Sequence, residues 1–268
     1  MFKSIFFGNQ ATILLLCGLI GLFDGCTNQQ NNSKNDIAID TLPLKKVDTA
    51  KVIYLTFDDG PLNGTEGILD ALDKEKIPAT MFMVGRHMKA DTEMKNKFEM
   101  AYNDNLLEVA NHSFSHANNH YEAYYKDPQK VLEDFNKNQE LLNFKDKDAR
   151  MPGRNTWRIG TRGKDDISAN GREAADLLHK NGYNLFGWDL EWQHSAGGKP
   201  VQTVQQMFEE IEKRINDPQR CFTPNHFVLL SHDEMFRKPW EVSELKQLVD
   251  LLKAKGYEFD HTDNYPGK

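Results

Sequence analysis

Two adjacent carboxylates stand where an apolar segment of this chain gives way to a turn. Residues 52–55 read VIYL and residues 56–61 read TFDDGP, so Asp58 and Asp59 come at the end of an expected buried strand. Side chains of an extended segment point alternately to opposite faces, so one carboxylate can hold a metal ion while the other moves a proton. Asp, Gly and Pro are also ordinary turn residues, and a plain turn is the alternative.

Two histidines are candidate partners of this pair. His112 and His116 begin and end the segment HSFSH, which follows the apolar segment 107–111. Residues four apart share one face of a helix, so both imidazoles converge on one ion if the chain is helical there. With one carboxylate they make a His/His/Asp set that suits zinc or another borderline divalent ion and leaves positions open for water and substrate. A pair of surface histidines is the alternative.

A further titratable group, His232, follows another expected strand, VLLS at residues 228–231. This place makes it a candidate general acid, and a structural hydrogen-bonding role is the alternative. Cys221 is the one cysteine of the globular part, with no histidine in a recognisable arrangement near it. That pattern favours a small buried apolar role over a catalytic thiol.

From residue 51 onward, apolar runs of strand length alternate with helix-period stretches, which is typical of parallel β/α units. The expected strands are Val52–Asp58, Ala79–Val84, Leu107–Asn111, Ala149–Met151, Leu185–Leu190, Phe227–Ser231 and Tyr257–Asp260. The expected helices include Glu66–Lys76, Pro128–Leu142, Arg172–Asn181, Val204–Ile215 and Glu241–Lys255. We therefore predict an α/β fold, a distorted (β/α) barrel with about seven strands, in which catalytic residues gather at the C-terminal strand ends.

Five segments, in this order, resemble the motifs of the polysaccharide deacetylases, which are carbohydrate esterase family 4 or the NodB-homology domain. They are TFDDG at 56–60, HSFSH at 112–116, RMPG at 150–153, DLEW at 189–192 and VLLSH at 228–232. The resemblance covers roughly residues 51–257, and the first two motifs match closely. It implies a NodB-like distorted barrel and metal-dependent removal of acetyl groups from N-acetylated sugars.

The resemblance also implies a role for each matching residue. Asp58 matches the catalytic base, Arg150 the residue that holds this base, and His232 the general acid. The implied metal ligands are Asp59, His112 and His116. Zinc is the first choice of metal, and this ligand set also admits cobalt, nickel or iron.

The third and fourth motifs depart from the family pattern. Gly153 stands where an aromatic residue is usual, so the backbone N–H remains as an oxyanion donor but an aromatic wall of the sugar site is lost. Glu191 stands where an aspartate is usual. We favour Glu191 as the partner of His232, and Asp189 is the alternative.

Three tryptophans and one loop complete the expected rim. Trp192 matches the fourth motif and is expected to form a pocket wall, whereas Trp157 and Trp188 are open between sugar contact and core packing. Residues 154–171 form a polar loop that either shapes a substrate groove or is simply solvated. No role is assigned to the remaining histidines, His87, His120, His179, His194, His226 and His261.

The first fifty residues differ in kind from the rest. Residues 11–23 form an apolar stretch of signal-peptide length, and Cys26 leads into a polar tract rich in Asn and Gln. This resembles a bacterial lipoprotein signal with Cys26 acylated; an uncleaved signal anchor or ordinary secretion are alternatives. We expect a leader over 1–26, a tether over 27–50 and the deacetylase domain over 51–268, in an exported periplasmic or envelope protein that is tethered to the membrane.

Charge and location narrow the function. The net charge is -7 and there is no dense Lys/Arg stripe, so an electrostatic case for nucleic acid is missing. We predict a hydrolase, a metal-dependent N-deacetylase of an N-acetylglucosamine-containing polysaccharide. Peptidoglycan is the first choice because an exported enzyme meets it. Exopolysaccharide or chitin oligomers are alternative substrates, and a non-catalytic lipoprotein that binds metal or glycan is the alternative function.

Overall fold

The computed structural model describes residues 50–268 of the chain. The expected leader, the lipidation site Cys26 and the tether up to residue 49 lie outside the described residues and stay predictions. Within residues 50–268, no helix has both the length and the apolar character needed to cross a membrane.

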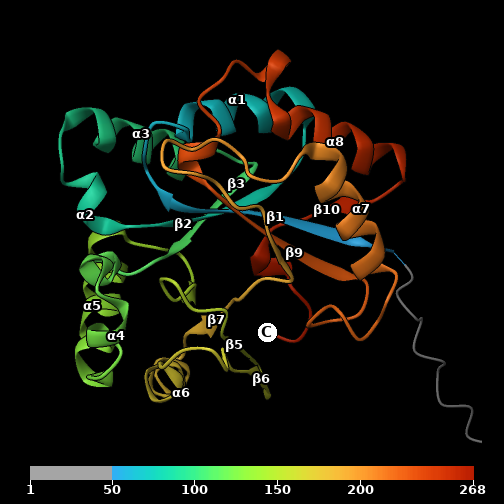
Figure 1. Cartoon of the computed structure of the whole chain (residues 1–268). Helices are drawn as coiled ribbons and strands as arrows, with labels where there is room; N and C mark the ends of the chain where they lie inside the picture. The colour runs from blue at the N-terminus through green and yellow to red at the C-terminus, as the bar shows by residue number, and fades with distance from the viewer. Residues whose placement is uncertain (1–49) are drawn as a thin grey trace, which may run out of the picture. The chain divides into compact units, whose positions relative to one another are not determined.

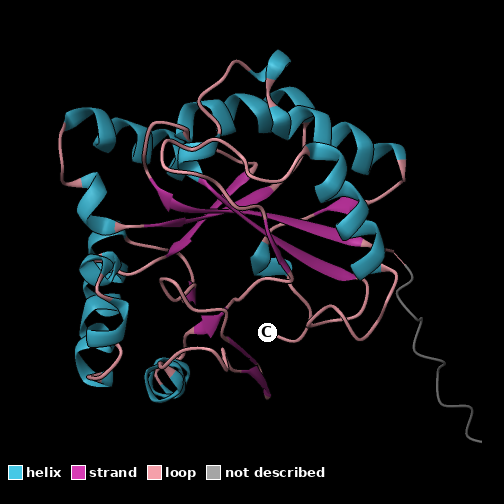
Figure 2. Cartoon of the chain, in the orientation of Figure 1, coloured by secondary structure: helices cyan, strands magenta, loops and turns pink. Residues whose placement is uncertain are grey.

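A curled, mostly parallel sheet runs through the described part (Figure 1 and Figure 2). Its strands are β1 (Val52–Gly60), β2 (Ala79–Met83), β3 (Leu107–Asn111), β4 (Asp148–Ala149), β5 (Trp157–Ile159), β6 (Arg162–Lys164), β7 (Asn184–Leu185), β8 (Leu190–Glu191), β9 (His226–His232) and β10 (Glu258–Phe259). They are ordered β6-β5-β7-β4-β3-β2-β1-β9-β8, with β10 beside the start of β1. The predicted α/β fold is confirmed, as a half-barrel rather than a closed barrel.

Helices cover this sheet. The α-helices are α1 (Thr65–Glu75), α2 (Gly85–Met88), α3 (Thr92–Asn103), α4 (Tyr121–Tyr124), α5 (Pro128–Leu142), α6 (Arg172–Lys180), α7 (Val204–Ile215) and α8 (Glu244–Ala254). Short 3-10 turns are η1 (His116–Asn119), η2 (Asp233–Met235), η3 (Trp240–Val242) and η4 (Thr262–Asn264). In Figure 1, α1, α3 and α8 lie above the central strands, and α4, α5 and α6 lie below and to the left.

The expected strand Leu185–Leu190 is divided in the structure. β7 pairs with β4 and β8 pairs with β9, and residues 186–189 lie between the two strands, with the N–H groups of Phe186 and Asp189 still donating to the carbonyl oxygens of Ala149 and Val228. The carbonyl oxygens of Phe186 and Gly187 accept hydrogen bonds from the side chain of Arg150 instead of from a strand. The buried guanidinium of Arg150 therefore replaces the strand-to-strand hydrogen bonds that these two carbonyl groups would otherwise accept.

Several elements were not among those expected from the sequence, including the short helices α2 and α4. The segment 154–171, predicted to be a polar loop, contains the antiparallel β5–β6 hairpin, which Trp157 and Ile159 anchor in the core. Helix α3 was also missed, because it buries only Lys97 and Ala101 and so has little apolar periodicity.

Strand β1 separates two apolar cores. Ile53, Leu55 and Phe57 belong to the core shared with α1, α7 and α8, whereas Val52 and Tyr54 belong to the core inside the curl. Alternation along the strand then directs the next inward positions, 56 and 58, toward the inside of the curl. The sequence pattern of β1 thus delivers Asp58 to the concave side.

The register of the sheet aligns the ends of five strands. Asp58 pairs with His232 across β1 and β9, Met83 pairs with Asn111, and Asn111 pairs with Ala149. His112 follows directly after β3, and Arg150 follows directly after β4. Parallel strands end at the same edge, so residues far apart in sequence gather on one rim.

Candidate active site

A bulge in β1 brings both carboxylates to the same place. The register with β2 shifts between Asp58 and Gly60, and Asp59 has a φ of 75°. Bulges re-aim side chains, and here the Nε2 atom of His112 lies 3.5 Å from Asp58 Oδ2 and 3.6 Å from Asp59 Oδ1. The expectation that the pair points to opposite faces is therefore wrong, because the regular pleat ends at Asp58.

The two histidines converge through a turn and not through a helix. Ser113 and His116 have φ values of 65° and 51°, which an α-helix does not contain. The turn is fixed by hydrogen bonds from Ser113 N–H to Asn111 Oδ1 and from His116 N–H to Ser113 Oγ, of 2.9 and 3.0 Å. The ring centroids of His112 and His116 are 5.1 Å apart. The predicted convergence occurs, but the helical geometry assumed for it was wrong.

Asp59, His112 and His116 form the expected ligand set. Their ligand atoms all lie within 4.8 Å of one another. Asp59 Oδ1 is 3.0 Å from His116 Nε2 and 3.6 Å from His112 Nε2. His112 is buried, and Asp59 and His116 are partly exposed toward solvent, so the set is open on one side.

The second nitrogen of each imidazole shows what this set can hold. His112 Nδ1 lies 2.8 Å from the carbonyl oxygen of Arg150, and His116 Nδ1 lies 3.1 Å from Asn119 Oδ1. Both partners are acceptors, so each Nδ1 carries the proton and each Nε2 presents a lone pair. Asp59 Oδ1 is buried and has no hydrogen-bond donor. Three acceptors that face one another in this way fit a divalent cation.

The electrostatics of these three residues also favour the binding of a cation. Burial lowers the pKa of His112 to about 4, so this ring is neutral at pH 7. Burial acts in the same direction on His116, but the negative charge of Asp59, whose Oδ1 lies 3.0 Å from His116 Nε2, raises the pKa of His116 above the ordinary value. Burial opposes ionisation of Asp59, yet His116, His112 and His232 hold the pKa of this carboxyl well below its usual range.

Asp58 is held by a different partner. Arg150 Nη1 donates to Asp58 Oδ1 at 2.8 Å and to Thr56 Oγ1 at 2.8 Å. The same guanidinium is fully buried and donates to the carbonyl oxygens of Phe186 and Gly187 at 3.1 and 2.9 Å. Arg150 therefore fixes Asp58 Oδ1 and leaves Oδ2 directed toward the histidine side.

The two candidate partners of His232 have unlike surroundings. Both carboxylate oxygens of Asp189 accept backbone N–H groups, those of Phe222 and Val228, at 2.8 Å each. Both oxygens of Asp189 are thus bonded to the backbone, and the alternative that Asp189 supports His232 is wrong. Glu191 lines the same cleft as His232 but makes no hydrogen bond to it, and His232 Nδ1 is buried without a partner among the described residues.

A cleft of about 230 Å³ lies over the ligand set. Its lining residues are Asp58, Asp59, His112, His116, Tyr121, Gly153, Trp188, Glu191, Leu230 and His232. Within residues 50–268, no hydrogen bond uses the N–H of Gly153, so this donor is available to a ligand. The ring of Tyr121 lies against Gly153 at the edge of this cleft.

The tryptophans are arranged differently from the prediction. Trp192 is fully buried, packs against Phe236 and donates its Nε1–H to the carbonyl oxygen of Gln202 at 3.0 Å. It belongs to the core beneath the helices and cannot wall the pocket, so that prediction was wrong. Trp157 is likewise buried and stacks on Phe222, whereas Trp188 lines the cleft.

Sequence reasoning missed three residues at this rim. His87 Nδ1 lies 2.8 Å from the carbonyl oxygen of Asp59. The ring of His194 lies 4.7 Å from that of His232, and the ring of Tyr121 stands edge-on to that of His116 at 5.7 Å. His87 and His194 each follow closely after a strand end, which is a sequence signal for this rim, whereas Tyr121 lies farther along the chain, in α4.

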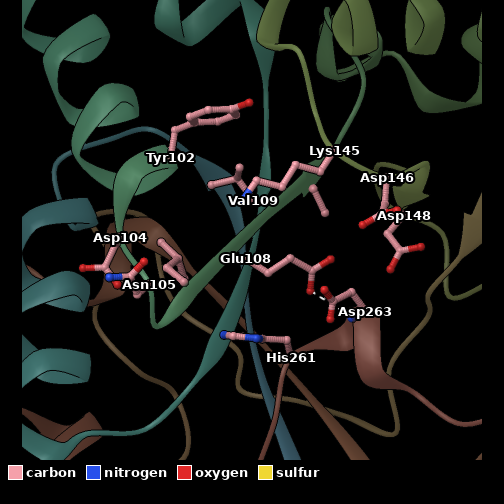
Figure 3. A pocket seen from close by; sticks show the side chains of 12 residues that line it. Tyr102, Asp104, Asn105, Glu108, Val109, Lys145, Asp146, Asp148, His261 and Asp263 are labelled. Atoms are coloured by element: carbon pink, nitrogen blue, oxygen red, sulfur yellow. Dashed lines mark hydrogen bonds between the residues drawn. The ribbon is translucent and has the colours of Figure 1, made fainter.

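A second cavity, of about 170 Å³, lies at the other end of the strands. Figure 3 shows Glu108 directed toward Asp263 there, with His261 nearby. Glu108 Oε2 accepts hydrogen bonds from Thr80, Thr262 and the N–H of Asp263, at 2.7, 2.9 and 3.1 Å. These groups are satisfied within the protein, so this cavity offers no ligand set like that of the rim.

Comparisons with known proteins agree with this geometry. Residues 45–154 match the sequence profile of the family described as polysaccharide deacetylase. The chain is 23% identical to a chitin disaccharide deacetylase from Vibrio alginolyticus (85% of this chain, 74% of that protein). It is 27% identical to a peptidoglycan-N-acetylglucosamine deacetylase from Bacillus cereus (78% and 68%). A solved CE4 esterase from Streptococcus mutans is 26% identical, with a TM-score of 0.60 over 80% of this chain and 86% of that one.

Proposed function

Because this chain belongs to the polysaccharide deacetylase family, we propose that it is a metal-dependent N-deacetylase of a polysaccharide that contains N-acetylglucosamine. The observation that carries the proposal is the pairing of Asp58 with His232 across β1 and β9, beside the cluster of Asp59, His112 and His116. A protein that only bound metal would need the cluster alone. The added base and acid are the groups that hydrolysis requires.

The reaction begins with attack of water on the carbonyl carbon of the acetamide, while Asp58 accepts a proton from that water. Asp59, His112 and His116 would hold a divalent cation, which would supply Lewis acidity to the acetamide carbonyl and to the attacking water. The N–H of Gly153 donates to the developing oxyanion, and one such donor lowers the barrier by about 3 kcal/mol. Protonated His232 passes its proton to the sugar nitrogen as the C–N bond breaks, which releases acetate and leaves a free amine.

We propose peptidoglycan as the substrate on the ground of location. The leader over residues 1–26, with Cys26 as the acylated residue, would place the domain in the cell envelope, where peptidoglycan is the abundant N-acetylated polymer. The named activity of the Bacillus cereus relative supports this choice, and that of the Vibrio alginolyticus relative supports chitin oligomers as the alternative. Mass spectrometry of membrane-fraction protein tests the anchor, since acylation adds the mass of fatty chains to the peptide that contains Cys26.

Acetate release tests the proposed reaction. The purified chain is stripped with a chelator, reloaded in parallel with zinc, cobalt, nickel or iron, and incubated with peptidoglycan, exopolysaccharide and an N-acetylglucosamine tetramer. We expect no release from the stripped protein and restored release with at least one metal, fastest on peptidoglycan. Release that is insensitive to the chelator would contradict metal dependence. Absence of release from every polymer with every metal would favour a binding protein.

A further inference from the structure

Tyr121 is an aromatic residue of the cleft whose hydroxyl is not used within the fold of residues 50–268. Three tyrosines lie close together in and after α4. The hydroxyl of Tyr124 donates to Asp134 Oδ2 at 2.9 Å, and the hydroxyl of Tyr125 donates to the carbonyl oxygen of Pro152 at 2.7 Å. The hydroxyl of Tyr121 has no hydrogen-bond partner in residues 50–268, and this side chain lines the cleft. Its neighbours serve the fold, and Tyr121 remains free to serve a ligand.

The ring of Tyr121 is nevertheless held in a defined place. It stands perpendicular to the His116 ring, with a centroid distance of 5.7 Å and an interplanar angle of 87°. The guanidinium of Arg154 lies 5.9 Å from its centroid, and Arg154 is itself bound to Glu122 at 2.9 Å. A flat apolar face is therefore fixed next to a member of the ligand set.

Position 153 is shaped to accommodate this ring. Gly153 has a φ of 63°, a conformation that favours glycine, and a Cβ added there would lie 3.3 Å from two ring atoms of Tyr121. A Cβ at position 153 would therefore require the ring of Tyr121 to shift by a few tenths of an ångström. The free N–H of Gly153 and the face of Tyr121 thus border the same space, one as a hydrogen-bond donor and the other as an apolar surface.

We propose that Tyr121 is a substrate-binding residue that selects an N-acetylated pyranoside: its ring covers the apolar face of the sugar that carries the acetamide, and its hydroxyl bonds a sugar hydroxyl. An apolar face beside a polar edge is the chemistry that recognises a sugar ring. This inference deepens the proposed function and rests on it for the identity of the sugar.

Binding and turnover are measured separately so that the two claims can fail separately. The probe is an N-acetylglucosamine tetramer, titrated by calorimetry into zinc-loaded protein that carries Asp58→Asn, which blocks the proposed hydrolysis. We expect Tyr121→Phe in this background to weaken binding by about threefold to tenfold, the usual worth of one hydrogen bond. Tyr121→Ala should weaken it by more than about tenfold, because the ring contact is also lost. Zinc affinity should stay unchanged in both.

Tyr102→Phe is the matched control. Its hydroxyl donates to the carbonyl oxygen of Asn143 at 2.9 Å, and the residue lines the cavity at the other end of the strands. This substitution should leave tetramer affinity unchanged. Equal affinity in the Tyr121 variants and their parent would overturn the inference, and so would failure of the parent to bind the tetramer. Tight binding that depends on Tyr121, in a protein whose wild type releases no acetate, would instead overturn only the proposed function.

Discussion

The imidazole of His87 lies with its Nδ1 2.8 Å from the carbonyl oxygen of Asp59. Asp59 has a φ of 75°, a conformation that costs a non-glycine residue roughly 1–3 kcal/mol and persists only where neighbours impose it. α2, which carries His87, also contacts the loop of residues 112–116, since Arg86 N–H donates to the carbonyl oxygen of Phe114 at 3.0 Å. One short helix therefore positions both segments that supply the ligand set.

Removing His87 should accordingly weaken metal binding. We expect His87→Ala to lower zinc affinity roughly tenfold, the lower end of what partners of metal ligands contribute. His87→Asn should recover part of the loss, because an Asn amide nitrogen lies near the position of Nδ1. Competition with a chromophoric chelator measures the affinity. His261→Ala, which removes a histidine bonded to the carbonyl oxygen of Leu106 at the other end of the strands, should leave it unchanged; equal loss in both variants would refute the positioning role.

Arg150 should contribute strongly to stability as well as to activity. Its buried guanidinium pairs with Asp58 and satisfies two backbone carbonyl groups. Arg150→Met leaves these acceptors without donors, and breaking a buried pair costs about 3–5 kcal/mol. Urea unfolding of the wild type and of Arg150→Met measures this difference in the free energy of unfolding. Arg220→Met is the control, because Arg220 pairs with Asp217, both side chains are exposed, and surface pairs contribute only about 0–1 kcal/mol. Similar losses in the two variants would contradict this assignment.

Glu108 should make stability depend on pH. Burial, together with the charge of Asp148, raises the pKa of Glu108 to about 7, against about 4.3 in the unfolded chain. Between these values the native state binds more protons than the unfolded state. The free energy of unfolding should therefore fall as pH rises from about 4.3 to 7, by at most about 1.4 kcal/mol per pH unit from this group.

The variant Glu108→Gln cannot titrate and tests this directly. In urea unfolding at intervals from pH 4.5 to 7.5, the free energy of unfolding should fall less steeply with pH in this variant than in the wild type. The difference in slope should approach that of one bound proton, about 1.4 kcal/mol per pH unit. Parallel curves for the two proteins would show that Glu108 keeps an ordinary pKa in the folded state.

The rim could be predicted from sequence because strand ends are visible there. The apolar runs before Asp58, His112 and His232 are strand patterns, and parallel strands end at one edge. The details depend on backbone geometry that no pattern of residue types records. The bulge at Asp59 and the turn at Ser113 both use positive φ at residues other than glycine, so the expected pleat and helix were wrong there.

Tertiary packing decided the rest. Trp192 was the expected pocket wall because it matches the fourth motif, but the chain path after β8 buries Trp192 against Phe236 and leaves Trp188 at the cleft. Asp189 lies on the same short segment as Glu191, and only its contacts with backbone N–H groups reveal a structural role. Tyr121 was missed because its distance from Gly153 in the sequence gives no sign of their contact in space.

The central claim is a division of labour between Asp58 and Asp59, and a paired measurement of zinc binding and acetate release on Asp58→Asn and Asp59→Asn tests it most directly. We expect Asp58→Asn to bind zinc with nearly wild-type affinity and to lose turnover by about 10²–10⁴-fold, because an amide cannot accept the proton from water. Asp59→Asn should lose zinc affinity at least roughly tenfold, since a charged ligand is removed. Retained turnover in Asp58→Asn, or equal loss of zinc affinity in both variants, would contradict the assignment.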